Sequence, residues 1–427
     1  MSGCPFRNLT DMSRRSFLKA FGGLAVAAGA GYGARYAYDG IAGNNALKAA
    51  TIPFYAGNQA GITTPQQGHI YFAALDIVSE KRDDIIKMLQ AWTQATARLT
   101  KGQPAQDAAS YDDKKTPDSD ETSSLSPANL TLTFGFGAGM FAKDGKDRYR
   151  LANHRPDALV DMPVFNGDQL IAEKSGGDIC LQSCADDPQV AFHAVRELVR
   201  FAAGTAQIRW TQTGFMSQPP NGETPRNLQG FKDGTQNPKK DEFDKFVWVG
   251  SEGPDWMQKG SYLITRKIRI ALEHWDNTPV DFQESVIGRH KISGAPLGKK
   301  NEFDALDLDA TDQDGNFIMP ENAHVRLASS IANDGAQILR RGYSYNDGIN
   351  FVAERWPPWR QGLEYDAGLL FVSFQRDPRT GFIKIFDNMA KFDALNQFVT
   401  HIGSSMFACP AGVQEGEYIG QKLFDKA

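Results

Sequence analysis

The chain has 427 residues, of which 41% are hydrophobic and 23% are charged, a composition typical of a globular protein with one large domain or two ordinary ones. The formal net charge of −5 provides no excess of basic groups for nucleic acid or an anionic membrane, so neither is expected as a partner. Four cysteines are too few to build a disulfide scaffold of this length.

The first forty residues predict an export signal rather than a part of the fold. Residues 13–19 read SRRSFLK, a twin-arginine sequence, and a mild run rich in glycine and alanine follows to about residue 34. That run is too short and too weakly apolar for a stable membrane span. The alternative, a chance arginine pair before an apolar helix, does not explain the flanking serine, phenylalanine, leucine and lysine. We therefore expect export through the twin-arginine route, to the periplasm or beyond, and such a route often carries proteins with a cofactor already inserted.

Four segments after the signal show a clear pattern. Residues 69–78 are apolar and β-prone, which predicts a buried strand, and residues 82–100 carry apolar side chains on one helical face. Residues 103–127 are crowded with Asp, Ser, Thr and Pro, which predicts a surface loop. Apolar side chains alternate over residues 130–136, which predicts a half-buried strand.

Cys180 and Cys184 lie where a short strand over residues 178–181 is expected to meet the next helix. Their C-x3-C spacing is a poor match to zinc ribbons and thioredoxin-like motifs. We interpret them as two small, partly buried side chains, with an oxidised pair in an exported protein as the alternative. No C-x-x-C-H sequence occurs, which excludes covalent attachment of a c-type haem.

A similar order of elements is predicted in the second half of the chain. Residues 262–275 are predicted as a long strand and residues 280–290 as a helix, followed by a long irregular segment. Residues 368–375 then predict a second buried strand, and residues 387–402 a helix.

The repeated order predicts duplicated α+β units, each an antiparallel sheet faced by helices. A turn-rich sequence, QPPNG, lies between residues 215 and 225 and marks a plausible boundary. With the signal assigned to residues 1–40, this gives one unit over residues 41–218 and a second over residues 219–427.

Residues 230–238, GFKDGTQNP, are the most informative stretch for function. Asp233 lies between Gly230 and Gly234, and such a turn can approach a flat ligand closely because glycine has no side chain to obstruct it. Taken alone, the stretch is better interpreted as an ordinary Asp-Gly turn.

A second and a third stretch add an imidazole and cations. His324 is followed by Arg326, and the pair Arg340 and Arg341 comes within twenty residues. The other six histidines are interpreted as ordinary core or surface residues. Haem requires an imidazole for its iron and cations for its propionates, so this combination is chemically suitable.

Together the three stretches resemble the dye-decolourising peroxidase family. GFKDGTQNP resembles its G-x-x-D-G motif, AHVRLA its axial-histidine segment and ILRRGYSY its distal-arginine segment, and the order agrees. The resemblance begins at residues 59–65 and covers nearly all of the chain after the signal. With the export signal, the chain is most similar to the EfeB-type subgroup, described as deferrochelatase/peroxidase.

The resemblance implies a fold and a cofactor. The fold would be two ferredoxin-like antiparallel sheet domains faced by helices, like a dimeric α+β barrel, with one non-covalent haem b in the C-terminal half. His324 would be the axial ligand of the haem iron, Asp233 the distal acid and base, and Arg340 the distal cation, chosen over Arg341 as the first arginine of the matched segment. Further residues are expected to line the haem or order the distal pocket: Gly234, Thr235, Gln236 and Asn237.

One departure from the subgroup concerns the haem propionates. The subgroup often continues its histidine segment as HIRLANPR, whereas this chain reads HVRLASSIAN and lacks the later arginine. The local substitutes for propionate binding are Arg326, Ser329 and Ser330. On the proximal side, Asp347 and Asp377 are the candidates to accept the second N–H of the axial histidine.

The resemblance also implies an activity. Hydrogen peroxide would oxidise the haem to a high-valent form, which bulky aromatic donors reduce in one-electron steps. Donors that cannot reach the haem would deliver electrons through surface aromatic residues. Four candidates are near the motif, although core packing is the expected role of each: Trp356, Trp359, Tyr343 and Tyr345.

A carboxylate base predicts activity in acid, because the ordinary pKa of aspartate is about 3.9 and that of histidine about 6.5. The alternative function is a periplasmic haem-binding protein that releases iron from haem and has incidental peroxidase activity. Its partners would be components of an iron-uptake system. The family resemblance further implies a homodimer, and the short, mild apolar run of the signal predicts no stable membrane anchor.

Overall fold

The structure, a computed structural model, describes residues 51–107, 118–353 and 361–426. Among these residues, no helix has the length and apolar character that a membrane span requires. The predictions that lie outside the described residues are those for the twin-arginine sequence, Cys4, Trp356, Trp359 and residues 108–117 of the predicted surface loop.

The first half of the described chain folds as strand, helix, two strands, helix and strand. Its antiparallel strands lie in the order β2-β3-β1-β4. The two long helices pack against each other, with Nε1 of Trp92 in α2 donating to the carbonyl oxygen of Leu198 in α4 over 2.6 Å. The elements are β1 (His69–Ile77), α2 (Arg82–Leu99), β2 (Thr131–Phe136), α3 (Ala138–Phe141), β3 (Ile179–Ala185), α4 (Pro188–Phe201) and β4 (Ala206–Phe215). The strands and helix predicted in this half agree with β1, α2 and β2, and β3 is longer than expected.

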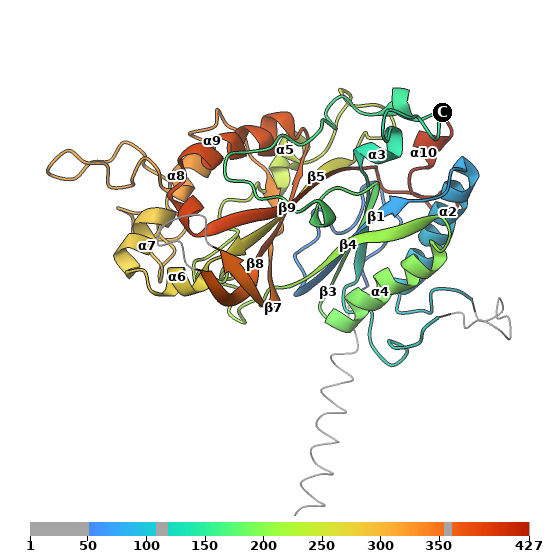
Figure 1. The fold of residues 1–427 in the computed structure, drawn as a ribbon, viewed down its shortest axis with the longest axis horizontal. Helices are drawn as coiled ribbons and strands as arrows, with labels where there is room; N and C mark the ends of the chain where they lie inside the picture. Colours follow the sequence, from blue (N-terminus) through green and yellow to red (C-terminus); the bar gives the residue numbers. More distant parts are fainter. Residues whose placement is uncertain (1–50, 108–117, 354–360, 427) are drawn as a thin grey trace, which may run out of the picture. The chain divides into compact units, whose positions relative to one another are not determined.

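The second half repeats the strand order of the first. Its long antiparallel strands lie as β7-β8-β5-β9, so in each half the second and third strands come before the first and fourth when the short β6 is left out. Short helices fill the long segment between β5 and β6, and Figure 1 shows α6 to α9 gathered beside this half of the strands. The elements are α5 (Phe243–Phe246), β5 (Ser261–Ile270), α6 (Leu272–Asp276), α7 (Val280–Ile287), α8 (His324–Ala328), β6 (Leu339–Arg340), β7 (Tyr343–Ala353), β8 (Gln361–Gln375), α9 (Lys384–Phe392), β9 (Val399–Cys409) and α10 (Gln421–Phe424).

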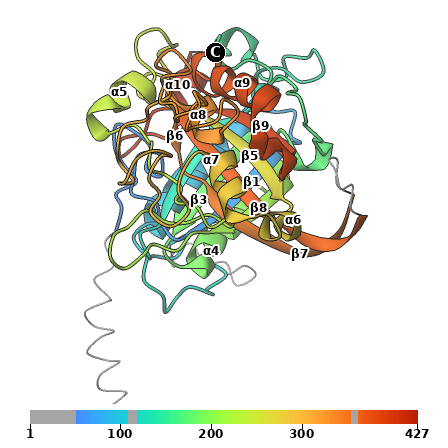
Figure 2. The same cartoon turned by 90° about the vertical axis from the view of Figure 1, so that its left-hand side faces the viewer.

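The two halves close into one barrel-like sheet. The strands β2 and β9 pair at one seam, β4 and β7 pair at the other, and β5 pairs with both β8 and β9. Eight strands therefore form a closed ring, and β6 adds to it beside β8. Buried side chains from both halves, Phe72, Leu370 and Phe407 among them, form one hydrophobic cluster. In Figure 2 the helices α7 and α8 lie in front of these strands, so the carboxyl-terminal half carries helices over the sheet.

The strand predicted over residues 262–275 ends earlier than expected. β5 stops at Ile270, which pairs with Val399, the first residue of β9. The N–H of Ala271 then donates to the carbonyl of Phe398, and the N–H of Trp275 donates to the carbonyl of Ala271, which starts a helical turn. The apolar pattern in the sequence extends into α6 because Trp275 is also buried, although it packs in a different hydrophobic cluster from the strand.

The helix predicted over residues 387–402 is wrong in its second part. α9 ends at Phe392, a short 3-10 helix follows, and residues from Val399 onward form β9. The carboxylate of Asp393 accepts the N–H of Leu395, and this cap starts the new turn. The β-branched residues Val399, Thr400 and Ile402 favour the strand that pairs with β5.

The interpretation of the cysteines as small buried side chains is confirmed for the described part of the chain. Cys180, Cys184 and Cys409 are buried and free. Cys180 and Cys184 both lie inside β3 rather than at its end.

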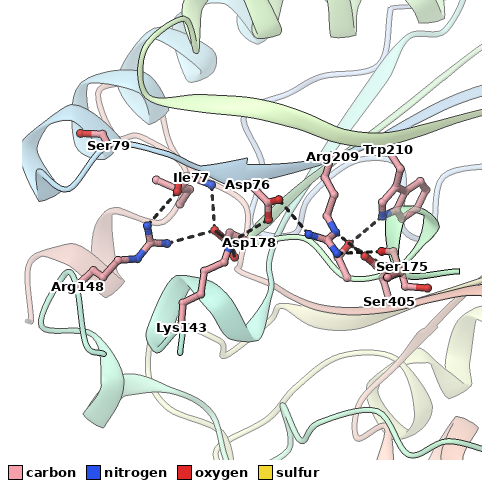
Figure 3. A network of polar contacts seen from close by, with 12 residues as sticks. Asp76, Ile77, Ser79, Lys143, Arg148, Ser175, Asp178, Arg209, Trp210 and Ser405 are labelled. Carbon is pink, nitrogen blue, oxygen red and sulfur yellow. Dashed lines mark hydrogen bonds and ion pairs between the residues drawn. The ribbon is translucent and has the colours of Figure 1, made fainter. Parts of the chain in front are cut away.

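A buried ionic network fastens the end of β1 to the turn before β3 (Figure 3). The carboxylate of Asp178 is buried and accepts the N–H of Ile77 at 2.9 Å, and it also accepts hydrogen bonds from Lys143 at 3.0 Å and from Arg148 at 3.3 Å. Asp76 shares Lys143 and continues the network. This network therefore links the end of β1 to the segment after α3 and to the turn before β3.

We expect Asp178→Ala to lower the free energy of unfolding by about 3 kcal/mol, because it leaves two buried or half-buried cations without their shared carboxylate. Urea unfolding followed by circular dichroism measures the loss. Asp76→Ala is the matched control, since Asp76 shares the network but is more exposed. Equal losses in the two variants would contradict this account.

Candidate functional site

The predicted glycine turn around Asp233 is held by a backbone hydrogen bond and by the packing of an aromatic ring beside it. The N–H of Asp233 donates to the carbonyl of Pro225 at 2.9 Å, and the ring of the buried Phe231 packs edge-on against Trp275. Gly234 has a φ of +114°, a conformation that favours glycine. A Cβ added there would meet no atom within 4 Å, so the turn has open space beside it.

An aspartate and an arginine meet at this open space. Oδ1 of Asp233 accepts a hydrogen bond from a terminal nitrogen of Arg340 at 3.0 Å, and each side chain is 30% exposed. Arg340 lies in β6, where it pairs with Ser373 of β8. Asn237 holds the backbone of Arg340 on both sides: its Nδ2 donates to the carbonyl at 2.9 Å, and its Oδ1 accepts the N–H at 3.0 Å. A base and a cation are thereby held side by side.

The neighbouring arginine points elsewhere. Arg341 is buried, and its guanidinium donates to the carbonyl oxygen of Thr64 and to Oε1 of Gln67. Of the two adjacent arginines, Arg340 is therefore the one beside Asp233.

His324, the first residue of α8, lies within hydrogen-bond distance of a buried carboxylate, that of Asp393. Its Nδ1 lies 2.7 Å from Oδ2 of Asp393, which is 3% exposed, while the histidine side chain is 29% exposed. The other oxygen of Asp393 accepts the N–H of Leu395 at 2.8 Å, so the carboxylate is fixed. A carboxylate partner assigns the hydrogen to Nδ1 and leaves Nε2 with a lone pair for a ligand.

The two aspartates expected in this position are elsewhere, so that prediction is wrong. Asp347 pairs with Lys267, and Asp377 forms a local pair with Arg379. The acceptor is Asp393, which lies 69 residues after the histidine. Its sequence pattern predicts only a helix cap, because Asp393 precedes a short helical turn, and this pattern does not identify it as the partner of an imidazole.

His324 lies close to the turn that carries Asp233, because Val325, the residue after His324, packs against the same hydrophobic cluster as Phe231. Burial lowers the pKa of His324, but the charge and hydrogen bond of Asp393 outweigh burial, and the pKa is raised above its ordinary value. Arg340 also acts on this imidazole, lowering its pKa, and Asp233 acts to raise it. A hydrophobic cluster joins the turn to the helices beneath it through Phe231 and Trp275. The three predicted stretches therefore meet in space.

The remaining predicted residues have local partners. Oγ1 of Thr235 donates to Glu302 at 3.0 Å, and Gln236 is exposed. The guanidinium of Arg326 donates to the carbonyl of Leu308 and lies over the ring of Phe317.

The two serines after α8 are also placed locally. Oγ of Ser329 donates to the carbonyl of Arg326 at 2.7 Å, and the carbonyl of Ser330 accepts the N–H of Gly335. Propionate binding by these serines and by Arg326 stays a prediction. Tyr343 and Tyr345 are buried, in agreement with their expected core role.

Comparison with known proteins gives matches over both halves. Residues 59–216 match the family model described as Dyp-type peroxidase, N-terminal, and residues 224–414 match the one described as Dyp-type peroxidase, C-terminal. The chain is 41% identical over 392 residues to a dye-decolorizing peroxidase of Thermobifida fusca (strain YX), covering 87% of this chain and 84% of that protein. It is 33% identical over 432 residues to a deferrochelatase of Escherichia coli (strain K12), covering 97% of each chain.

Solved structures give the same picture. The fold is similar to that of ferric DtpA from Streptomyces lividans, with a TM-score of 0.79 at 38% identity over 89% of this chain and 98% of that chain. It is also similar to a DyP-type peroxidase from Cellulomonas bogoriensis, with a TM-score of 0.78 at 35% identity over 89% and 99% of the two chains. The mixed α/β fold with an antiparallel sheet is thereby established.

Proposed function

The chain belongs to the Dyp-type peroxidase family, and from this premise we propose that it is a haem b peroxidase that uses hydrogen peroxide to oxidise bulky aromatic, dye-like donors in one-electron steps. The observation that carries the proposal is that the carboxylate-paired His324 and the ion pair of Asp233 with Arg340 lie on segments that pack together, through Val325 and Phe231, in one hydrophobic cluster. Protein haem sites use such an imidazole on iron and polar groups to activate the bound oxidant.

The residues present fit a haem. His324 offers Nε2 as a ligand atom because Asp393 holds Nδ1, and this pairing increases the basicity of a ligating imidazole. The open space beside Gly234 lets a flat ring approach the turn, and the backbone of Gly234, Thr235 and Gln236 would line it. Bound haem would supply the iron that takes up peroxide and accepts its oxidising equivalents.

The distal residues would move one proton and offset one charge. The carboxylate of Asp233 accepts the proton from one oxygen of hydrogen peroxide and returns it to the other oxygen, which leaves as water. The guanidinium of Arg340 stabilises the negative charge that develops on the leaving oxygen. Asn237 acts indirectly, because it fixes the backbone of Arg340 beside the base.

We expect Asp393→Asn to speed haem dissociation by about 10- to 100-fold, because a neutral amide no longer holds the imidazole as an electron-rich ligand. Transfer of haem to excess apomyoglobin measures the rate. Asp387→Asn on the exposed face of α9 is the control, since Asp387 is exposed and pairs with Lys391 of the same helix. Equal dissociation rates in the wild type and Asp393→Asn would contradict a supporting role for Asp393.

The proposal includes two ferredoxin-like units, residues 41–218 and 219–427. Support comes from the equal strand orders of the two halves, β2-β3-β1-β4 and β7-β8-β5-β9. The two family matches also end and begin on either side of the proposed boundary. A homodimer, and export to the periplasm by the twin-arginine sequence, complete the proposal.

A second candidate function is release of iron from haem, with components of an iron-uptake system as partners. The similarity over 97% of the chain to a deferrochelatase favours it. Mixing the haem-loaded protein with peroxide and an anthraquinone dye distinguishes the two. Catalytic loss of dye absorbance supports the peroxidase, whereas metal-free porphyrin with its ring intact supports iron release.

A further inference from the structure

A buried carboxylate outside the three predicted stretches holds the turn that carries Asp233. Glu302 is 9% exposed, and its Oε2 accepts a hydrogen bond from Nζ of Lys232 at 2.7 Å. Its Oε1 accepts one from Oγ1 of Thr235 at 3.0 Å and another from Oγ1 of Thr224. One side chain therefore accepts hydrogen bonds from three donors, two in the turn and one, Thr224, in the segment that leads into it.

The donors flank the base. Lys232 immediately precedes Asp233, and Thr235 follows Gly234, so the carboxylate of Glu302 bridges the two sides of the tip. At Gly234 the tip is open on one side, because a Cβ there would meet nothing within 4 Å. The polar contacts of Glu302 at both flanks add to the backbone bond of Asp233 in fixing where its side chain lies.

Glu302 is itself held rigidly. Arg289 is buried, and one of its terminal nitrogens donates to the carbonyl oxygen of Glu302 at 2.8 Å and to that of Gly294 at 2.6 Å. At Gly294 a Cβ would come within 2.8 Å of Lys232 and 3.3 Å of Glu302, so the backbone packs closely against this pair. The anchor is thus fixed to the segment after α7.

The carboxylate is also kept ionised. Burial acts to raise the pKa of Glu302, but the hydrogen bonds from Lys232, Thr224 and Thr235 outweigh it, and the pKa lies below its ordinary value. The carboxylate of Glu302 therefore keeps its negative charge at the acidic pH at which Asp233 is expected to act as a base.

We propose that Glu302 is a positioning residue for Asp233, acting through Lys232 and Thr235, and that it sets the rate at which the enzyme reacts with peroxide. The inference rests on the proposed function, because it concerns the same base. It assigns to Glu302 no contact with haem or peroxide. Displacement of a reacting group by about 1 Å can cost about 100-fold in rate, so loosening this anchor has a measurable effect.

The test uses the haem-loaded protein and the second-order rate constant for peroxide, followed by stopped-flow absorbance. Glu302→Gln removes the ion pair with Lys232 and is expected to slow the reaction by about 10- to 100-fold while the Soret band is kept. Glu223→Gln is the matched control, because Glu223 also lies near Lys232, at 3.6 Å, but is 54% exposed. The control is expected to react at the wild-type rate.

A double variant separates positioning from general damage. In an Asp233→Asn background there is no base to position, so adding Glu302→Gln is expected to change the rate less than twofold. Independent, multiplicative losses would overturn the proposal, as would a wild-type rate in Glu302→Gln. If Glu302→Gln does not fold, Thr235→Val replaces it, because it removes the hydrogen bond between Thr235 and Glu302. A slower reaction with peroxide is then expected, and a wild-type rate would overturn the proposal. An unchanged rate in Asp233→Asn alone would instead contradict the proposed function.

Discussion

Asp233→Asn is expected to slow the reaction with hydrogen peroxide by about 10²- to 10⁴-fold, the usual contribution of a positioned general acid and base. Asparagine has nearly the same shape and can still accept a hydrogen bond from Arg340, but it cannot take up the peroxide proton. The Soret band should be retained, because no ligand to the iron is changed. Stopped-flow mixing with peroxide measures the rate.

Asp241→Asn is the control for this variant, since Asp241 is an exposed carboxylate a short distance along the same segment. It should react like the wild type. A normal peroxide rate in Asp233→Asn would remove the base from the account, whatever the protein does with dyes.

His324→Ala is expected to abolish stable haem binding, seen as loss of the Soret band in protein purified with excess haem. The imidazole supplies the bond to iron, and alanine offers no donor atom. The variant also leaves Asp393 buried without its partner, so a lower melting temperature is expected.

His290→Ala is the matched control for the ligand, because His290 also pairs with a carboxylate, that of Glu284, but lies on the surface. It should keep a full Soret band. A His324→Ala protein with wild-type haem content would show that another residue binds the iron.

Local patterns in the sequence predicted much of the fold. The apolar run that forms β1 and the helical face of α2 were recognisable because each uses one period throughout. The errors lie where two elements follow each other without a break in hydrophobicity. Trp275 continues the apolar pattern of β5 although it belongs to α6, and the strand β9 begins where a helix was expected.

Closure of the sheet could not be predicted from local pattern. The pairing of β2 with β9 joins Phe136 to Ala408, and the pairing of β4 with β7 joins Phe215 to Ser344. These contacts connect the two halves, and no periodicity within either half specifies them.

The residues of the candidate site also fall into two groups, those that a local sequence pattern predicts and those that depend on contacts between distant parts of the chain. Asp233, His324 and Arg340 were predicted because each lies in a short sequence with its own chemical pattern. Asp393 and Glu302 were missed because their roles depend on partners about 70 residues away in the chain. A carboxylate becomes a partner of an imidazole, or an anchor for a turn, only once the chain has folded.

The central claim is that His324 and the Asp233–Arg340 pair together make a haem peroxidase. The most direct test is the absorption spectrum of the purified, haem-loaded protein before and after one equivalent of hydrogen peroxide. The account predicts a Soret band that shifts within the mixing time and returns when an aromatic donor is added. A protein without a Soret band, or one whose band is unaltered by peroxide, would contradict it.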